Sequence, residues 1–387
     1  MNLIHCLLYV YLLLRPYYLF ESGGLQISDI FLIIAFIFYI ISSKKNQNKL
    51  MNTLNDNKEF LFFTLLTYAI NVIYFIIYVK FKFILSSLYF TFNFMAILLF
   101  VACANNNKFI KNMEKILKLN LWIQLIVYLL NIGKYYDPTR YMGTFNDPNQ
   151  FGYYILLSMG FIYLFDATLK NNKYQLIYFT LSLYLIYLSA STGMMLGMFA
   201  FFALWLFNSF RNINTIVRKN KNKIIIAASF LLLIIPTLYL TNNLKLPSHL
   251  ESSVIFSRAL DKLNRTSENQ LGSSYTIWEE RGYDKIQYYP QYLIFGSGEG
   301  EYERFNKSAN RNEIHATLPS IWFYYGIIPF LLVLKWIYRK TKKLPSNMQI
   351  VYIALLIESF TLLNQRQALF WIIFAIGNNL AELQRTQ

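Results

Sequence analysis

The feature that most constrains this chain is a series of long apolar segments separated by polar connections. A segment of about 17–25 apolar residues crosses the hydrocarbon core of a bilayer as a helix. Only 14% of the residues are charged, against roughly 25% in ordinary soluble domains. We therefore predict an all-α polytopic membrane protein, a single membrane domain over residues 1–387, with about 12 transmembrane helices at 3–20, 28–43, 60–79, 83–104, 116–133, 151–169, 174–189, 193–210, 224–241, 318–337, 348–364 and 368–382.

The placement of basic residues predicts the orientation. Most Lys and Arg residues fall in alternate connections, such as 44–58 and 211–223, and in the C-terminal tail. Cytoplasmic connections carry an excess of Lys and Arg, so both termini are predicted to be cytoplasmic. The formal net charge of +16 is then mainly an orientation signal. Because the basic connections are short and lack interleaved aromatic residues, no nucleic-acid partner is expected.

The same orientation places one long segment outside the cytoplasm, residues 242–317 between the ninth and tenth predicted spans. It is far longer than a connection needs to be, and long loops are usually functional or disordered. Its aromatic residues, Trp278 and Tyr283 among them, argue against disorder. We expect a small, partly helical cap lying over the membrane surface.

A polar loop before the sixth predicted span, TRYMGTFNDPNQFGYY, begins at Thr139 and lies on the same outer side. Arg140 carries a planar fork of donors that suits a phosphate group, but it is also explained as a snorkelling or loop-capping arginine. Asn146 and Asn149 flank Asp147 and Pro148, a set that favours a turn and a cap for the next helix. Taken alone, the loop is either a site or only a turn.

Two further polar groups are candidates on the outer side. His315 closes the long segment, where a neutral imidazole is a plausible general base, and Glu313 could orient it or raise its pKa. The alternative is a water-facing residue at a helix start. Glu358 lies inside a predicted span, which makes it a functional candidate by default. It could pair with Arg366 or be a neutral structural residue.

The run GSGEGEYER, residues 296–304, is a weak signal. A glycine-rich turn can cradle a nucleotide phosphate, but a tight turn is the simpler interpretation on the outer side. Glu299, Glu301 and Glu303 alternate, so an extended segment puts them on one face. A solvated acidic edge is favoured there over a divalent-ion site. Cys6 and Cys103 fall in predicted spans, and no disulfide is implied.

One motif and the end of the long segment resemble a known family. Arg140, Gly143, Phe145, Pro148 and Asn149 stand as in R-x-x-G-x-F-x-x-P-N, which resembles the signature of the O-antigen polymerase and O-antigen ligase family. The Trp-bearing stretch, the FGSGEG run and the histidine before a helix are similar to the same family in chain order. The resemblance covers roughly residues 134–335 by motif and the rest by topology.

This resemblance implies a C-type glycosyltransferase-like architecture on the outer face of the bacterial inner membrane. It implies undecaprenyl-pyrophosphate-linked oligosaccharides as donor and acceptor, membrane lipids around the chain, and a chain-length regulator protein as a further candidate partner. His315 would be the base and Arg140 would hold the pyrophosphate, with no metal or other cofactor. Arg281 would stand in for a second family arginine. Tyr288 and Tyr289 offer ring faces to sugars or belong to an interfacial belt.

Departures from the ligase pattern favour the polymerase branch. Thr192 or Gly193 stands where ligases often carry Arg, Ser274 stands where they carry another, and Ala316 follows the histidine in place of Asn. We therefore expect a metal-independent polymerase of lipid-linked repeat units, for O-antigen or capsular polysaccharide. The alternatives are a ligase that moves a finished glycan to a lipid or protein acceptor and a transporter of lipid-linked sugars.

Overall fold

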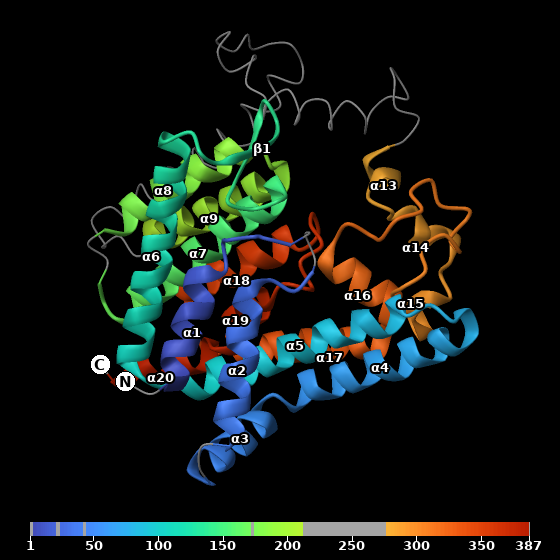
Figure 1. Ribbon diagram of the computed structural model, residues 1–387, viewed down its shortest axis with the longest axis horizontal. Coiled ribbons are helices and arrows are strands. Elements are labelled where there is room, and N and C mark those ends of the chain that lie inside the picture. The colour runs from blue at the N-terminus through green and yellow to red at the C-terminus, as the bar shows by residue number, and fades with distance from the viewer. Residues whose placement is uncertain (1–2, 21–23, 42–43, 172–173, 212–275, 387) are drawn as a thin grey trace.

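The computed structural model describes residues 3–20, 24–41, 44–171, 174–211 and 276–386 (Figure 1). This part of the chain is mostly helical, and one two-stranded antiparallel sheet joins its helices. The elements are α1 Leu3–Leu14, α2 Ile27–Ile41, α3 Lys44–Asp56, α4 Lys58–Tyr78, α5 Lys82–Cys103, α6 Asn107–Leu129, β1 Lys134–Asp137, β2 Arg140–Gly143, α7 Pro148–Thr168, α8 Gln175–Ser189, α9 Thr192–Arg211, α13 Ile277–Glu280, α14 Asp284–Tyr288, α15 Tyr292–Phe295, α16 Thr317–Tyr325, α17 Ile327–Thr341, α18 Ser346–Glu358, α19 Ala368–Ala375 and α20 Gly377–Thr386.

The predominantly helical fold class is confirmed, but the number of spans is not. Every predicted span in the described residues coincides with a helix or a pair of helices, and the span predicted at 224–241 lies outside them. Among the described residues, three helices are long and apolar enough to cross a membrane, namely α4, α5 and α7. Five more apolar helices are shorter, so they are not counted by that criterion.

Two predicted spans are interrupted. The span predicted at 318–337 is divided into α16 and α17 at Gly326, which has φ +77. A side chain is excluded there, because an added Cβ would lie 2.4 Å from the carbonyl oxygen of Ile294. The span predicted at 348–364 ends as a helix at Glu358, and residues 359–367 form an irregular connection to α19. These breaks create the irregular backbone from which the candidate site is built.

Two predicted connections are ordered. The basic connection 44–58 contains helix α3, whose Leu50 and Leu54 pack against the core. The polar loop before α7 contains the β1–β2 hairpin, in which Tyr135 pairs with Tyr141 and Asp137 pairs with Arg140. The described end of the long segment 242–317 carries three short helices, α13, α14 and α15. It is therefore partly helical in that part.

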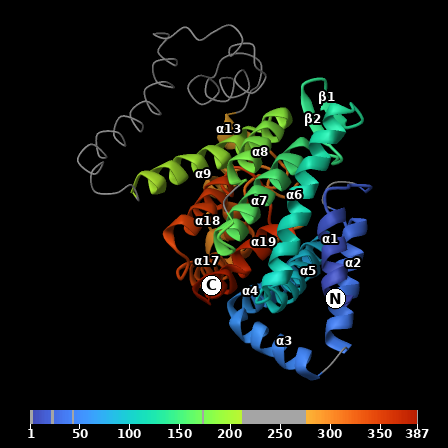
Figure 2. The same ribbon diagram turned by 90° about the vertical axis from the view of Figure 1, so that its left-hand side faces the viewer.

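Helix α7 lies at the centre of the bundle, where 94% of its most apolar stretch is buried. Helices α1, α2 and α6 run upright beside it, whereas α4 and α5 cross toward the side that carries α14 and α15 (Figures 1 and 2). The N- and C-terminal ends lie at the same end of the bundle, and the hairpin lies at the opposite end. Helices α6 and α7 therefore span the body between these two faces.

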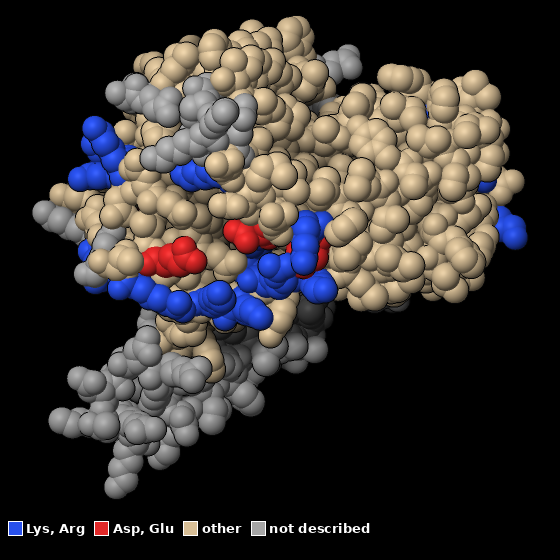
Figure 3. Space-filling model, turned by 90° about the horizontal axis from the view of Figure 1, so that it is seen from below, with Lys and Arg blue, Asp and Glu red and all other residues tan. Residues whose placement is uncertain are grey.

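Basic side chains gather on the lower face of the molecule (Figure 3). Lys and Arg form a band there with fewer Asp and Glu among them. Exposed lysines of the predicted cytoplasmic connections include Lys108, Lys111 and Lys343. This lower face is therefore rich in basic residues.

Candidate functional site

The first and last residues of the R-x-x-G-x-F-x-x-P-N motif contact each other. Arg140 lies on β2, is buried, and donates through Nη2 to Oδ1 of Asn149 at 3.1 Å. The same oxygen accepts a hydrogen bond from Oγ of Ser191 at 2.9 Å, just before α9. The guanidinium also lies over the ring of Tyr136, 5.6 Å from its centroid. The motif therefore closes into a loop that fixes one arginine against the starts of α7 and α9.

The predicted helix cap is confirmed. Asp147 accepts a hydrogen bond from the backbone N–H of Gln150 at 2.9 Å, and Pro148 occupies the first turn of α7. Asn146, a predicted substrate-binding residue, makes two contacts within the fold. Its amide donates to the carbonyl oxygen of Phe20 and accepts from Lys134, so it ties the hairpin to the chain after α1.

The irregular connection 359–367 collects contacts from segments far apart in the sequence. The backbone carbonyls of Ser359 and Leu362 accept hydrogen bonds from Thr317 at 2.7 and 2.8 Å. The carbonyl of Gln365 accepts from Asn93 on α5 and from Trp371 on α19, each at 2.8 Å. A break between two helices is stabilised in this way by donors from other elements, as buried irregular backbone requires.

Arg366 lies at the end of this connection and joins two carboxylates of the long segment. Its Nη2 lies 2.8 Å from Glu299 and 2.7 Å from Glu313. Burial alone lowers the pKa of the guanidinium, but the two carboxylates outweigh burial and hold the pKa of Arg366 well above its ordinary value. Tyr302 also contacts the pair, 3.4 Å from Arg366 and 3.3 Å from Glu313.

Glu299 is buried, so the predicted solvated acidic edge is wrong at this position. Its carboxylate accepts from Tyr325 at 2.7 Å and from Gln365 at 2.8 Å, in addition to Arg366. The glycine-rich run places it there, because its own N–H bonds Asn71 and the preceding N–H groups bond carbonyls of α16. The backbone donors of the run are therefore used within the fold, as a tight packed turn requires. Glu303 remains exposed.

His315 and Arg281 contact each other through the backbone. The N–H of His315 donates to the carbonyl of Arg281 at 3.0 Å, and the Arg281 guanidinium donates back to the carbonyl of His315 at 3.3 Å. The guanidinium also donates to the carbonyl of Thr361. Within the described residues no side chain hydrogen-bonds the half-buried imidazole of His315. Arg281 therefore holds the histidine against the 359–367 connection.

The surroundings of His315 lower its pKa and so favour the neutral imidazole. Burial lowers the pKa of the imidazole, and the positive charges of Arg281 and Lys285 lower it further, while Glu313 opposes them. Glu313 raises the pKa of His315, as expected from the sequence, but burial and the two cations outweigh it and the net direction is downward. Glu313 is occupied by Arg366 and Tyr302. A neutral imidazole keeps a free lone pair, which a general base needs.

Helix α9 joins the Arg140 loop to the residues around Arg281 and His315. A Cβ on Gly193 would lie 2.8 Å from Oγ1 of Thr361, so the start of α9 packs directly on the connection that holds Arg281. Ser191, two residues earlier, bonds Asn149 and so reaches the Arg140 loop. This contiguous path of contacts, from Arg140 to His315, defines the candidate site. Arg140 and His315 themselves share no direct contact in the described structure.

Glu358 lies at the base of the candidate site and does not pair with Arg366. The amide of Asn364 donates to both of its carboxylate oxygens, at 3.0 and 3.1 Å. The side chain is fully buried. Of the two expected roles, the contacts favour the structural one, in which Glu358 fixes the turn that follows it.

The two tyrosines predicted to contact sugars differ from each other. Tyr288 is exposed at the end of α14. The hydroxyl of Tyr289 donates to Asn306 at 3.1 Å and accepts from the backbone of Lys307, while its ring packs against Tyr292 and Phe305. Tyr288 is thus available at the surface, whereas Tyr289 stabilises the long segment.

One buried arginine near the site had only a weak signal in the sequence. Arg15, after α1, donates to Gln367 at 2.6 Å and lies 3.4 Å from Asp29. Arg15 and Arg366 line the same small cavity together with Tyr89. A lone charge at the outer end of a predicted span was the available signal, but its partner at position 367 is not apparent from the sequence.

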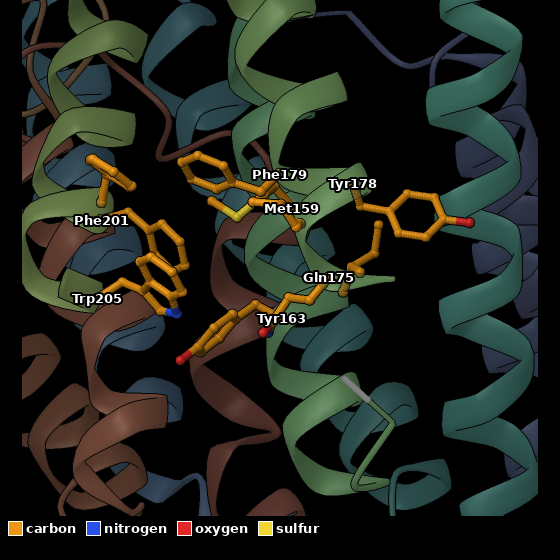
Figure 4. A pocket seen from close by; sticks show the side chains of 10 residues that line it. Met159, Tyr163, Gln175, Tyr178, Phe179, Phe201 and Trp205 are labelled. Carbon is orange, nitrogen blue, oxygen red and sulfur yellow. The ribbon is translucent and has the colours of Figure 1, made fainter. Parts of the chain in front are cut away.

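The described residues hold no group of three or more His, Cys, Asp or Glu side chains that could bind a metal ion. An apolar cavity of about 270 Å³ lies between α7, α8 and α9 (Figure 4). Met159, Phe179, Phe201 and Trp205 surround it, with Gln175 at its side. Its lining is mostly apolar and suits hydrocarbon, and the described residues that line it include no Lys or Arg for a phosphate.

Comparisons with known proteins find no relative of this chain. No protein-family model matches this chain, and no curated protein is similar to it at a significant level. The functional interpretation therefore rests on the motif residues and on the contacts described above.

Proposed function

We propose that this chain polymerises oligosaccharide repeat units linked to undecaprenyl pyrophosphate, for O-antigen or capsular polysaccharide. The reaction takes place on the outer face of the bacterial inner membrane. About 12 spans cross that membrane, and both termini are cytoplasmic. The donor bond is already activated, so the reaction needs no nucleotide from the cytoplasm.

The observation that carries the proposal is the convergence of the outer segments. Arg140 from the motif loop and His315 from the end of the long segment lie on one path of contacts through α9 and the 359–367 connection. These are the residues to which the family resemblance gives the pyrophosphate and the acceptor hydroxyl. This path joins segments that lie more than a hundred residues apart in the sequence.

The contacts suggest different tasks for the three arginines. Arg366 is neutralised by two carboxylates and Arg281 is directed at backbone carbonyls, so both position the site. Arg140 donates to the amide oxygen of Asn149 and lies over the ring of Tyr136, and it is the arginine of the motif that the family resemblance places at the pyrophosphate. We assign the pyrophosphate to Arg140, since a fixed cation stabilises the negative charge that develops on the leaving group.

The base is His315. Its neutral imidazole accepts the proton of the acceptor hydroxyl as that oxygen attacks the anomeric carbon, and the bond from this carbon to the pyrophosphate oxygen breaks. The leaving undecaprenyl pyrophosphate stays in the membrane. General-base catalysis of this kind contributes about 10²- to 10⁴-fold to a rate.

The glycan profile of a deletion strain tests this function against its alternatives. Loss of a polymerase leaves acceptors that carry a single repeat unit. Loss of a ligase leaves long polymer on the carrier lipid, and loss of a transporter leaves repeat units inside the cell. Either of the last two profiles would contradict the proposal.

A further inference from the structure

A tyrosine-lined cavity of about 250 Å³ opens beside the β1–β2 hairpin at the outer end of the bundle. Tyr128 of α6, Tyr135 and Tyr141 of the hairpin and Tyr187 of α8 line it, together with Thr139 and Ala190. The Tyr141 ring packs on its neighbours, with centroids 5.2 Å from Tyr128 and 5.1 Å from Tyr135. Three separate elements thus form one cavity wall.

Tyr141 carries a polar group that the fold does not satisfy. The residue is 1% exposed, and its hydroxyl makes no hydrogen bond within the described part of the chain. Leaving a buried hydroxyl unpaired costs free energy, so such groups in native proteins usually meet a ligand or water. Ala190, also in the lining, has the left-handed φ of +49, which is strained for a residue with a side chain.

The lining selects one class of ligand. Its described residues include no Lys, Arg, Asp or Glu, so the cavity does not suit a phosphate or another ion. Its tyrosine hydroxyls and Thr139 make it too polar for an acyl chain. Ring faces that pack on C–H groups, beside hydroxyls that donate and accept, are typical contacts of a neutral sugar. The volume accommodates one sugar ring.

The β1–β2 hairpin separates this cavity from Arg140. Side chains alternate between the two faces of a strand. Tyr141 and the paired Tyr135 line the cavity, whereas Arg140, the neighbour of Tyr141 on β2, contacts Asn149 and the ring of Tyr136. A sugar and a pyrophosphate therefore meet different faces of the same two strands.

We propose that this cavity binds a neutral sugar ring of the nascent glycan, next to the pyrophosphate face of the hairpin. The inference rests on the proposed function for the identity of the glycan, and the cavity itself is independent of it. Nothing in the R-x-x-G-x-F-x-x-P-N motif assigns Tyr128, Tyr135 or Tyr187 a role.

Photo-crosslinking in cells tests the ligand class directly. A benzophenone amino acid replaces Tyr187 in the cavity or, as the control, Tyr174 at the other end of α8, since each native side chain is 47% exposed. The probe is the cells' own pool of polysaccharide intermediates, detected by mass spectrometry of the crosslinked peptide. We expect sugar adducts at position 187 and none at 174. A phospholipid adduct at 187, or no excess of sugar there over 174, would overturn the proposal.

A matched pair of substitutions tests the unpaired hydroxyl. Tyr141→Phe should raise the concentration of the lipid-linked glycan at half-maximal rate by about two- to tenfold, the value of one hydrogen bond. Without this substrate its unfolding temperature should be unchanged or higher. Tyr11→Phe on α1 removes another buried, unpaired hydroxyl and should leave half-saturation unchanged. Unchanged half-saturation in Tyr141→Phe would contradict the subsite. If the purified chain forms no polymer, the proposed function has failed, and crosslinking alone decides the subsite.

Discussion

Replacing Arg366 by Met should destabilise the protein, because it leaves a buried carboxylate without its cation. The side chain of Glu299 is 1% exposed, and Arg366 is its charged partner at 2.8 Å. Tyr325 and Gln365 remain as neutral donors to the same group. Removing one partner of a buried ion pair costs about 3–5 kcal/mol. We expect a loss of that size in the free energy of unfolding, measured by SDS titration in mixed micelles.

Glu313 provides the matched control for this loss. It bonds the same guanidinium at 2.7 Å, but its side chain is 23% exposed and reaches water. Glu313→Gln should therefore cost about 1 kcal/mol or less, as partly solvated ion pairs do. The double variant Arg366→Met with Glu299→Gln should recover most of the loss, since it removes the charge together with its partner.

The same variants separate a structural role of Arg366 from a catalytic one. If Arg366 gripped the pyrophosphate, Arg366→Met would stop turnover while the free energy of unfolding stayed near that of the wild type. The contacts predict instead that Arg366→Met lowers the free energy of unfolding. A loss in Arg366→Met no larger than in Glu313→Gln would refute the reasoning from burial.

Three further predictions concern the site and the orientation. Arg140→Lys should reduce the polymerisation rate clearly, because an ammonium lacks the bidentate fork of a guanidinium. Arg140→Ala should reduce it by about a hundredfold or more, because a lost donor to a developing anion costs roughly 2.7–4 kcal/mol. Full activity in Arg140→Lys would exclude bidentate binding of the pyrophosphate by Arg140. His315→Ala should lower the polymerisation rate about 10²- to 10⁴-fold. In the wild type, the rate should fall toward acid pH with a midpoint below 6.5, the ordinary pKa of histidine, because burial lowers the pKa of His315 and only the neutral form accepts a proton. A midpoint above 6.5 would contradict this. In a background without native cysteines, Lys307→Cys should react with an impermeant maleimide in intact cells and Lys343→Cys should not; the opposite pattern would reverse the orientation.

Local features of the fold follow from the sequence. Asp147 and Pro148 predict the start of α7, because a capping side chain and a fixed φ act within one turn of the chain. The helical segments follow from the apolar runs for the same local reason. The break at Gly326 does not, since it depends on the backbone of Ile294 lying against it.

The interior of the site could not be predicted because its contacts are long-range. Residues 359–367 include Phe360, Leu362 and Leu363, so they continue an apolar run in the sequence. They leave the helix because Thr317, Asn93 and other distant donors bond their carbonyls. Glu299 was expected in solvent for the same reason, since its partners Asn71 and Arg366 lie 228 and 67 residues away.

The most direct test of the central claim is a single-turnover assay with purified protein in liposomes. The substrate is the lipid-linked repeat unit, and the wild type is compared with Arg140→Ala and His315→Ala at equal amounts of folded protein. The proposed function predicts a ladder of products several repeat units long, with release of one undecaprenyl pyrophosphate for each bond formed and with little product from either variant. A single transfer to another acceptor without a ladder, or a full ladder from both variants, would contradict it.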